Sequence, residues 1–274
     1  MRLDLIITTH ERPDALAAVL ASLGRQSRPP DALWIADDGS GPTTAAAVAA
    51  HAATATYPVH HLRQAHEGFR VARLRNLALA AADRATPRPD YVVLLDGDMV
   101  MHPEFLADHA RAARPGHWLQ GARVLLDDAA THRVLAGGTP PGPLGTGLGT
   151  RRRAYLWRAP RRLPAALSAA LSHLGNALLS IKACNQGFWL QDLLATNGYD
   201  ERIEGWGPED KELCARLENA GIRRRSLLGG GVAWHLAHPP APRDRRSVGE
   251  AILRDTVRSG RTRSEYGIAR KAAW

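Results

Sequence analysis

Two short segments that lie far apart in the chain carry closely spaced carboxylates. One is LLDGDMV, in which an apolar run ends in Asp96 and Asp98. Side chains two positions apart on an extended segment project to the same face, so both carboxylates could reach one ion. Oxygen ligands suit Mg²⁺ or Mn²⁺, which makes this a candidate site for a hard divalent cation. A solvated turn is the alternative, because Asp-Gly pairs are common turn formers.

The second segment, GWGPED, places Glu209 and Asp210 directly after a proline. Proline is favoured at the first position of a helix, so the pair should lie in the first turn, where free N–H groups and the helix dipole favour ionised carboxylates. Such a carboxylate can act as a general base toward a hydroxyl group. Trp206 lies between two glycines and offers a flat apolar surface for a sugar ring. Compensation of the helix dipole alone is the alternative for the acidic pair.

A third segment, VAWHLAHP, contributes His235 and His238. An imidazole from this segment would complete an oxygen and nitrogen ligand set that favours Mn²⁺ over Mg²⁺. Surface histidines beside a proline-rich loop are the alternative. Zinc is disfavoured, because Cys184 and Cys214 lie apart and no third soft ligand stands nearby.

Composition narrows the class of protein. With 274 residues the chain can form one large α/β domain or two modest ones. A net charge of +9 and a pI near 10.3 favour anionic partners. Aromatic residues make up only 5% of the chain, so the interleaved aromatic side chains of a nucleic-acid-binding surface are lacking and we expect no nucleic-acid partner. Two cysteines and the absence of an export signal or a long apolar run predict a cytoplasmic protein.

Strands and helices should alternate along the first hundred residues. Strands are predicted at 3–8, 32–40, 57–64 and 90–100, and helices at 14–27 (with Asp14 as N-cap), up to about 52, and 70–85. Four alternations indicate a parallel, doubly wound sheet, whose active site lies beyond the carboxyl ends of its strands. Both acidic pairs, Asp37–Asp38 and Asp96–Asp98, follow such strand ends. A helix at 102–113, a strand at 116–126, a Gly/Pro loop at 136–150 and a helix at 164–182 should follow.

Six segments, ITTHERP, IADDGS, ARLRN, LLDGDM, GYDERIEGWGPED and the final histidine segment, occur in this order. Together they resemble the inverting nucleotide-diphospho-sugar glycosyltransferases of the GT-A fold, of the family 2 type, and the C-terminal half resembles the β-1,4-galactosyltransferases. The resemblance implies one α/β, Rossmann-like GT-A domain with a mostly parallel central sheet and helices on both faces. Its expected parts are a nucleotide-sugar half at 1–125, an acceptor half at 126–240 with a basic helical insert at about 151–182, and a charged helical tail at 241–274.

The resemblance also implies residue roles. Asp38 would accept a hydrogen bond from uracil, Asp98 would be the chief metal ligand, Asp210 the base and Glu209 the acceptor-holding group. The expected donor-binding residues are Thr8, His10, Arg12, Asp38, Arg73, Asn76, Asp96 and Asp98, the acceptor-binding residues are Trp206, Gly205 and Asn185, and the metal ligands are Asp98, Asp96, His238 and His235. Between the two histidines, His238 is slightly favoured. HERP departs from the family pattern, which usually has an aromatic residue or Asn before the arginine.

One base and one metal, without a second carboxylate as nucleophile, suit a single in-line displacement with inversion. The sequence therefore predicts a metal-dependent transferase, using Mn²⁺ or Mg²⁺, that moves a sugar from a nucleotide diphosphate such as a UDP-sugar to a hydroxyl of a glycan or glycolipid, as in cell-surface polysaccharide biosynthesis. A sugar-phosphate nucleotidyltransferase is disfavoured, because HERPDALAAVL is no Gly-rich phosphate loop. A nucleotide-sugar-binding protein without turnover is the remaining alternative.

A leucine stripe, at residues 163, 167, 171, 174 and 178, follows six arginines between 151 and 162. A basic amphipathic helix of this kind could lie on the inner face of an anionic membrane or bind a phosphorylated glycolipid. Packing of the leucines on the core is the alternative.

Overall fold

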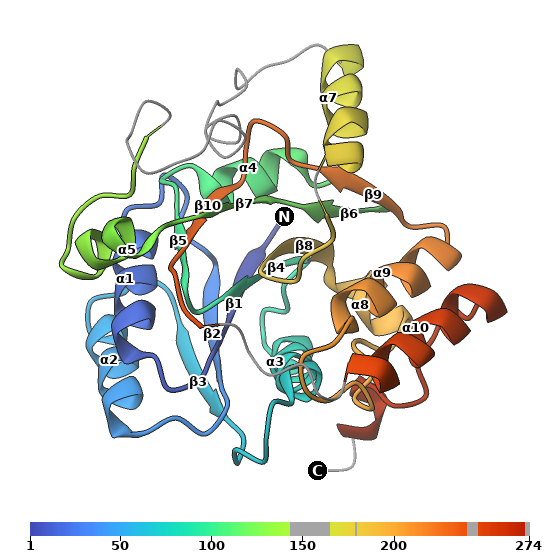
Figure 1. Cartoon of the computed structure of the whole chain (residues 1–274), viewed down its shortest axis with the longest axis horizontal. Helices are drawn as coiled ribbons and strands as arrows, with labels where there is room; N and C mark the ends of the chain where they lie inside the picture. Colours follow the sequence, from blue (N-terminus) through green and yellow to red (C-terminus); the bar gives the residue numbers. More distant parts are fainter. Residues whose placement is uncertain (143–164, 179, 240–245, 272–274) are drawn as a thin grey trace.

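The computed structural model describes residues 1–142, 165–178, 180–239 and 246–271 (Figure 1). A seven-stranded sheet forms its centre, in the order β3-β2-β1-β4-β8-β6-β9. These strands are β1 (Leu3–Thr9), β2 (Ala32–Asp37), β3 (Val59–Arg63), β4 (Tyr91–Asp96), β6 (His117–Gln120), β8 (Asn185–Trp189) and β9 (Arg223–Ser226). Only β8 runs antiparallel to its neighbours, β4 and β6. The expected α/β architecture with a mostly parallel sheet is confirmed.

A second, three-stranded sheet joins β5 (Met99–Met101), β10 (Val232–His235) and β7 (Ala122–Leu125). Two predicted strands are therefore each divided between the two sheets. The predicted strand at 116–126 breaks at Gly121, where a Cβ would lie 2.2 Å from the Asn185 side chain. The predicted strand at 90–100 breaks at Gly97, where a Cβ would lie 2.8 Å from the Thr8 carbonyl oxygen. Close packing at these two glycines turns the chain from one sheet into the other.

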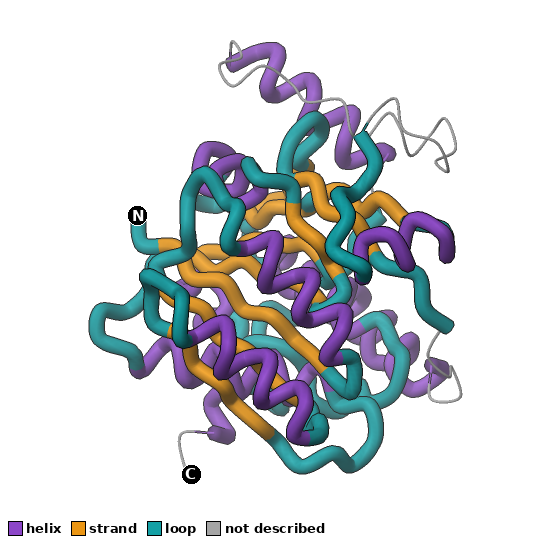
Figure 2. Tube along the Cα trace, turned by 90° about the vertical axis from the view of Figure 1, so that its left-hand side faces the viewer, coloured by secondary structure: helices purple, strands orange, loops and turns teal. Residues whose placement is uncertain are grey.

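Helices cover both faces of the large sheet (Figures 1 and 2). The described helices are α1 (Pro13–Leu23), α2 (Pro42–Ala52), α3 (Val71–Arg84), α4 (Phe105–Ala112), α5 (Asp128–Leu135), α7 (Ala165–Leu178), α8 (Leu190–Ala195), α9 (Glu209–Asn219), α10 (Arg246–Ser259) and the 3₁₀ turn η1 (Ile268–Lys271). Side chains of β1 alternate between two buried clusters: Leu5 and Ile7 pack with α1 and α4, and Ile6 packs with α3 and α9. Asp14 is not the N-cap of α1, because the helix begins one residue earlier, at Pro13.

The leucine-rich helix α7 packs against β9, where Asn176 accepts a hydrogen bond from Ser226 at 2.7 Å. Leu167 and Leu174 are each 47% exposed, so these two members of the predicted stripe do not pack in the core. The six arginines at 151–162 lie outside the described residues. No helix in the described ranges is long and apolar enough to cross a membrane.

The C-terminal segment packs against the rest of the fold. Helix α10 lies along α9, and η1 lies against α3 (Figure 1). Ile268 is 9% exposed and belongs to the same buried cluster as α3 and α9. The segment expected as a charged tail therefore contributes apolar side chains to the core.

Candidate active site

The Asp-Gly-Asp segment forms the turn between β4 and β5 at the carboxyl end of the large sheet. The Gly97 N–H donates to the Thr8 carbonyl at 2.7 Å, which fixes this turn against the end of β1. The Leu236 N–H donates to the Asp98 carbonyl at 3.0 Å and brings the end of β10 to the same place. Two segments about 140 positions apart in the sequence therefore meet at Asp98 because β5 and β10 pair.

Three of the predicted metal ligands gather at this point. Asp98 Oδ2 lies 3.1 Å from His238 Nε2 and 3.7 Å from His235 Nε2. Arg12 approaches the same oxygen at 3.7 Å. One ligand atom from each of Asp98, His235 and His238 lies within 4.8 Å of the others. Asp98 Oδ1 is buried and has no hydrogen-bond partner among the described residues.

These residues fit a divalent cation. A carboxylate and two imidazoles form the mixed oxygen and nitrogen set that suits Mn²⁺, and the unpartnered buried oxygen is a further available ligand atom. Burial alone would raise the pKa of Asp98, but the hydrogen bond from His238 and the nearby His235 and Arg12 lower it below the usual range. Burial lowers the pKa of His235, which favours the neutral form that a metal requires.

Asp96, the fourth predicted ligand, makes different contacts. Its Oδ1 accepts hydrogen bonds from Arg75 and Thr8, both at 3.1 Å. Thr8 and Arg12, both predicted near the donor, therefore lie at the Asp96–Asp98 turn.

A second histidine cluster lies at the ends of β1 and β2. Asp38 accepts hydrogen bonds from Gln64 at 2.7 Å and pairs with His66 at 3.1 Å. The His10 and His66 rings are stacked, with centroids 4.2 Å apart and planes 12° apart. Nitrogen lone pairs lie in the ring plane, so two parallel stacked rings cannot direct them at one ion. This cluster therefore does not fit a metal. Asp38 and His10, which are both predicted to contact the nucleobase, lie next to each other in it.

Arg75 joins the two acidic segments. Its guanidinium donates to Asp96 at 3.1 Å and to Glu209 at 3.0 Å. The side chain is 4% exposed, and the guanidinium lies 5.3 Å from the centroid of the Tyr199 ring. Arg73 and Asn76 were predicted from the sequence as donor-binding residues, and Arg75 was not. Helical periodicity could have found it, because position 75 follows the buried Ala72 by three residues and precedes the buried Leu79 by four.

The Pro-Glu-Asp segment starts α9, as predicted, although Pro208 is the N-cap and Glu209 the first helical residue. Asp210 accepts hydrogen bonds from the backbone N–H of Ala183 at 3.0 Å and of Lys211 at 2.7 Å. Burial raises the pKa of Asp210. Burial and the adjacent Asp210 raise the pKa of Glu209 to about 7, although Arg75 opposes the shift.

Cys184 lies at the centre of these groups. Burial raises the pKa of its thiol to about 12, and the charges of Asp96, Asp98 and Asp210 add to this rise. All three carboxylates therefore lie close enough for their charges to act on this one buried sulfur.

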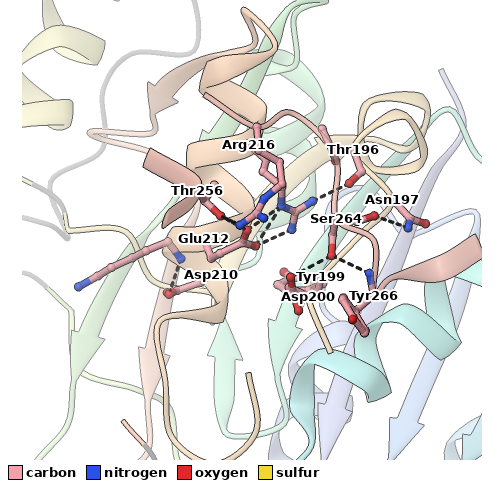
Figure 3. Close-up of polar contacts among 12 residues, drawn as sticks. Thr196, Asn197, Tyr199, Asp200, Asp210, Glu212, Arg216, Thr256, Ser264 and Tyr266 are labelled. Atoms are coloured by element: carbon pink, nitrogen blue, oxygen red, sulfur yellow. Dashed lines mark hydrogen bonds and ion pairs between the residues drawn. The ribbon is translucent and has the colours of Figure 1, made fainter. Parts of the chain in front are cut away.

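Helix α9 is held by a buried ion pair (Figure 3). Arg216 donates three hydrogen bonds to the Glu212 carboxylate, at 2.7, 2.9 and 3.0 Å, and one to the Thr196 carbonyl at 2.6 Å. Thr256 of α10 donates to Glu212 at 2.8 Å. These contacts fix the helix whose first turn carries Asp210.

Two residues that were predicted to contact the substrates are buried inside the fold. Asn185 is fully buried, and its amide bonds to the carbonyls of Ala122 and Gly231 and to His109. Asn76 is also fully buried, and its amide bonds to Tyr199 and Glu201. Both amides satisfy buried polar groups, so neither is available to a substrate.

The remaining predicted residues, Trp206, Gly205 and Arg73, are at least partly exposed. Trp206 is 36% exposed, with the Arg246 guanidinium 5.5 Å from its ring. Gly205 has φ of 73° and donates its N–H to the Phe69 carbonyl at 2.7 Å. Arg73 lines a separate cavity of about 270 Å³ with Arg70, Glu201, Arg202, Glu204 and Tyr266.

Two family models match parts of the sequence. The sequence model of glycosyl transferase family 2 matches residues 4–138. The model described as the N-terminal domain of galactosyltransferase matches residues 166–238. Validoxylamine A glucosyltransferase from Streptomyces hygroscopicus subsp. limoneus is 29% identical over 231 residues, which cover 80% of this chain and 48% of that relative. The chain thus spans about half the length of the curated relatives it matches.

Solved structures share the fold. S. aureus TarS in complex with UDP has a TM-score of 0.62 at 16% identity, covering 99% of this chain and 68% of that chain. Glucosyl-3-phosphoglycerate synthase from Mycobacterium tuberculosis, in complex with Mn²⁺, UDP and glucosyl-3-phosphoglycerate, has a TM-score of 0.51 at 18% identity, covering 94% and 77%. The chain has the GT-A fold. It resembles the family 2 glycosyltransferases over its first half and the galactosyltransferases over residues 166–238.

Proposed function

We propose that this chain is an inverting, metal-dependent glycosyltransferase that moves a sugar from a nucleotide diphosphate, a UDP-sugar, to a hydroxyl of a glycan or glycolipid. The observation that carries the proposal is the Arg75 bridge. It ties Asp96, beside the candidate metal ligands, to Glu209, beside the candidate base, through two hydrogen bonds. A metal site and a base at one place are what displacement of a diphosphate by a hydroxyl requires.

Asp98, His235 and His238 would hold Mn²⁺ or Mg²⁺, which when bound offsets the charge on the departing diphosphate. Asp210 takes the proton of the acceptor hydroxyl, since two backbone N–H groups fix its carboxylate at the start of α9. Glu209 hydrogen-bonds the acceptor, and the Trp206 ring stacks on a sugar. Asp38 and His10 contact the base, in line with the UDP bound in two of the related structures.

A panel of nucleotide sugars, each with and without Mn²⁺, tests the proposal. Thermal stabilisation by one donor, together with slow hydrolysis of that donor, should appear only with the metal. Donor binding that is equal with and without metal would contradict it. The same panel identifies the donor sugar.

Asp210→Asn tests the base. It should lower turnover by about a hundredfold or more, which is the lower end of the range for general base catalysis, while the affinity for the metal–donor complex stays nearly unchanged. Asp128→Asn is a matched control, because Asp128 is exposed in the first turn of α5, away from the site. If donor affinity falls and turnover at saturating donor does not, Asp210 is a donor contact and not the base.

A further inference from the structure

Two cationic side chains near Asp210 have no ionic partner in the described part of the chain. Arg123 and Lys182 are both half-buried, and neither makes a hydrogen bond or an ion pair through its side chain with any described residue. The other cations of the site are paired: Arg75 with Asp96 and Glu209, and Arg12 with Asp98.

The backbone holds Lys182 beside the candidate base. Its N–H donates to the Gln120 side-chain oxygen at 3.0 Å, and its carbonyl accepts from the same side chain at 3.1 Å. The next N–H, that of Ala183, is a hydrogen-bond donor to Asp210. Hydrogen bonds at Lys182 itself and at the next residue therefore fix the backbone of Lys182 relative to Asp210.

Arg123 approaches from the small sheet. In the parallel pairing of β7 with β10 it lies opposite Ala233, and His235 follows two positions later. Residues two apart on a strand share a face, so Arg123 lies on the face that carries the candidate metal ligand His235. Its charge acts on His235, on the Cys184 thiol and on Lys182.

The two cations lie close enough for the charge of Arg123 to act on Lys182. Burial and the charge of Arg123 lower the pKa of Lys182, whereas Asp210 raises it. Two half-buried like charges without counter-ions repel each other, and such a pair is an electrostatic site for an anion.

We propose that Arg123 and Lys182 bind an anionic group of the acceptor, a phosphate or a carboxylate, next to the hydroxyl that Asp210 deprotonates. This inference rests on the proposed glycosyl transfer and names the class of acceptor. The donor diphosphate is the other possible source of such an anion. The acceptor is favoured because the residue after Lys182, Ala183, donates its N–H to Asp210 at 3.0 Å, which places Lys182 beside the candidate base.

The experiment uses the full chain saturated with UDP and Mg²⁺, so that the donor diphosphate site is filled. Glycerol 3-phosphate and glycerol are titrated calorimetrically as a pair of probes that differ in the anionic group. The unaltered chain should bind the phosphate and not the neutral alcohol. Lys182→Met and Arg123→Met should each weaken that binding by about tenfold or more, the order expected for one charge-assisted hydrogen bond.

UDP affinity should stay unchanged in both variants, which also shows that they fold. Arg258→Ala is the control for loss of one positive charge, because this side chain is 85% exposed on α10. Weakened UDP binding with unchanged binding of glycerol 3-phosphate would assign the pair to the donor and overturn the proposal, as would no binding of glycerol 3-phosphate by the unaltered chain. Failure of the proposed function is a separate result, namely no metal-dependent binding of UDP by the unaltered chain.

Discussion

Asp98 and Glu209 are both largely buried carboxylates beside cationic groups, yet their surroundings shift the pKa values of the two groups in opposite directions. At Asp98, contacts with His238, His235 and Arg12 outweigh burial, and the pKa falls. At Glu209, burial and the neighbouring Asp210 outweigh one buried arginine, and the pKa rises to about 7. One carboxylate is therefore ionised at any physiological pH, as a metal ligand must be, and the other exchanges its proton near neutrality.

The acidic pair predicts a pH dependence of transfer. Since Asp210 must be ionised to act as base, and its pKa is raised, kcat/KM should fall as pH decreases through a midpoint above the ordinary range of an aspartate. Asp210 raises the pKa of Glu209, so Asp210 loses its proton first, while Glu209 is still neutral. Glu209→Gln should therefore leave the midpoint of the kcat/KM profile nearly unchanged. A pH profile of each protein measures this, and a clear shift of the midpoint to lower pH would mean that a charged Glu209 acts on Asp210.

The metal ligands give a second prediction. Asp98→Asn and His238→Ala should each weaken Mn²⁺ binding by about tenfold or more, because each removes a ligand atom. His66→Ala should leave Mn²⁺ affinity unchanged, since the stacked His10–His66 rings cannot converge on an ion. Each protein is titrated with Mn²⁺ in the absence of nucleotide, and the signal of the free ion gives the amount that is bound. This measurement distinguishes the two clusters. Stronger loss in His66→Ala than in His238→Ala would reverse the assignment.

The chemical type of a residue made some of these positions predictable. Asp98, His235 and His238 were predicted as metal ligands because carboxylate oxygens and imidazole nitrogens suit a divalent cation, and the fold brings these three side chains together. Arg75 was missed, because its partners, Asp96 and Glu209, are distant in the sequence and only the fold brings them together. Asn185 was misassigned for a related reason: its amide bonds to backbone carbonyls that only the paired sheets place around it.

Among the helices and strands, α9 and α10 depend on each other. Glu212 and Arg216 are fully buried on α9, and Thr256 of α10 completes the hydrogen bonding of the carboxylate. Thr256 also accepts a hydrogen bond from Arg261 at 2.7 Å. The ion pair is therefore satisfied only when α10 is docked.

Thr256→Val tests this dependence with little change in side-chain shape. It leaves Glu212 and Arg261 each without one partner, so the free energy of unfolding should fall by about 1–3 kcal/mol. Thr54→Val is the matched control. Its hydroxyl bonds only to a carbonyl at the exposed end of α2, and the change should be within about 0.5 kcal/mol. Urea unfolding measures both, and equal effects would mean that the buried hydroxyl has no special role.

The strands show what periodicity can and cannot predict. Apolar runs located β1, β2 and β4, since buried parallel strands are continuously apolar. The edge strand β3, with the sequence VHHLR, is only partly buried. The breaks at Gly97 and Gly121 were not predicted. They follow from contacts with Thr8 and Asn185, and no local propensity encodes these contacts.

For the molecule as a whole, the C-terminal segment closes the side of the fold that carries α9. Asn197 donates to the Ser264 carbonyl at 2.7 Å, and Ile268 packs with the helices behind the sheet. The segment 241–274 was expected to be a tail, because its sequence is rich in charge and has few apolar residues. Its docking depends on single residues such as Ile268 and Thr256, which a composition average does not reveal.

A chain ending at residue 240 is therefore expected to be markedly less stable than the full chain. Removal of α10 and η1 would remove the Thr256 hydrogen bond to Glu212 and uncover one edge of the buried cluster at Ile268, and together these losses should cost roughly 3 kcal/mol or more. Asp210 lies on the same helix, so transfer activity should decrease with stability. Thermal unfolding with and without UDP and Mn²⁺ measures the loss. Val257→Ser is the control, because this side chain is 62% exposed on α10 and contributes little to docking. If the chain of 240 residues unfolded at the same temperature as the full chain, the C-terminal segment would not contribute to stability. The hydrogen bond from Thr256 of α10 to Glu212 of α9 would then have no energetic role.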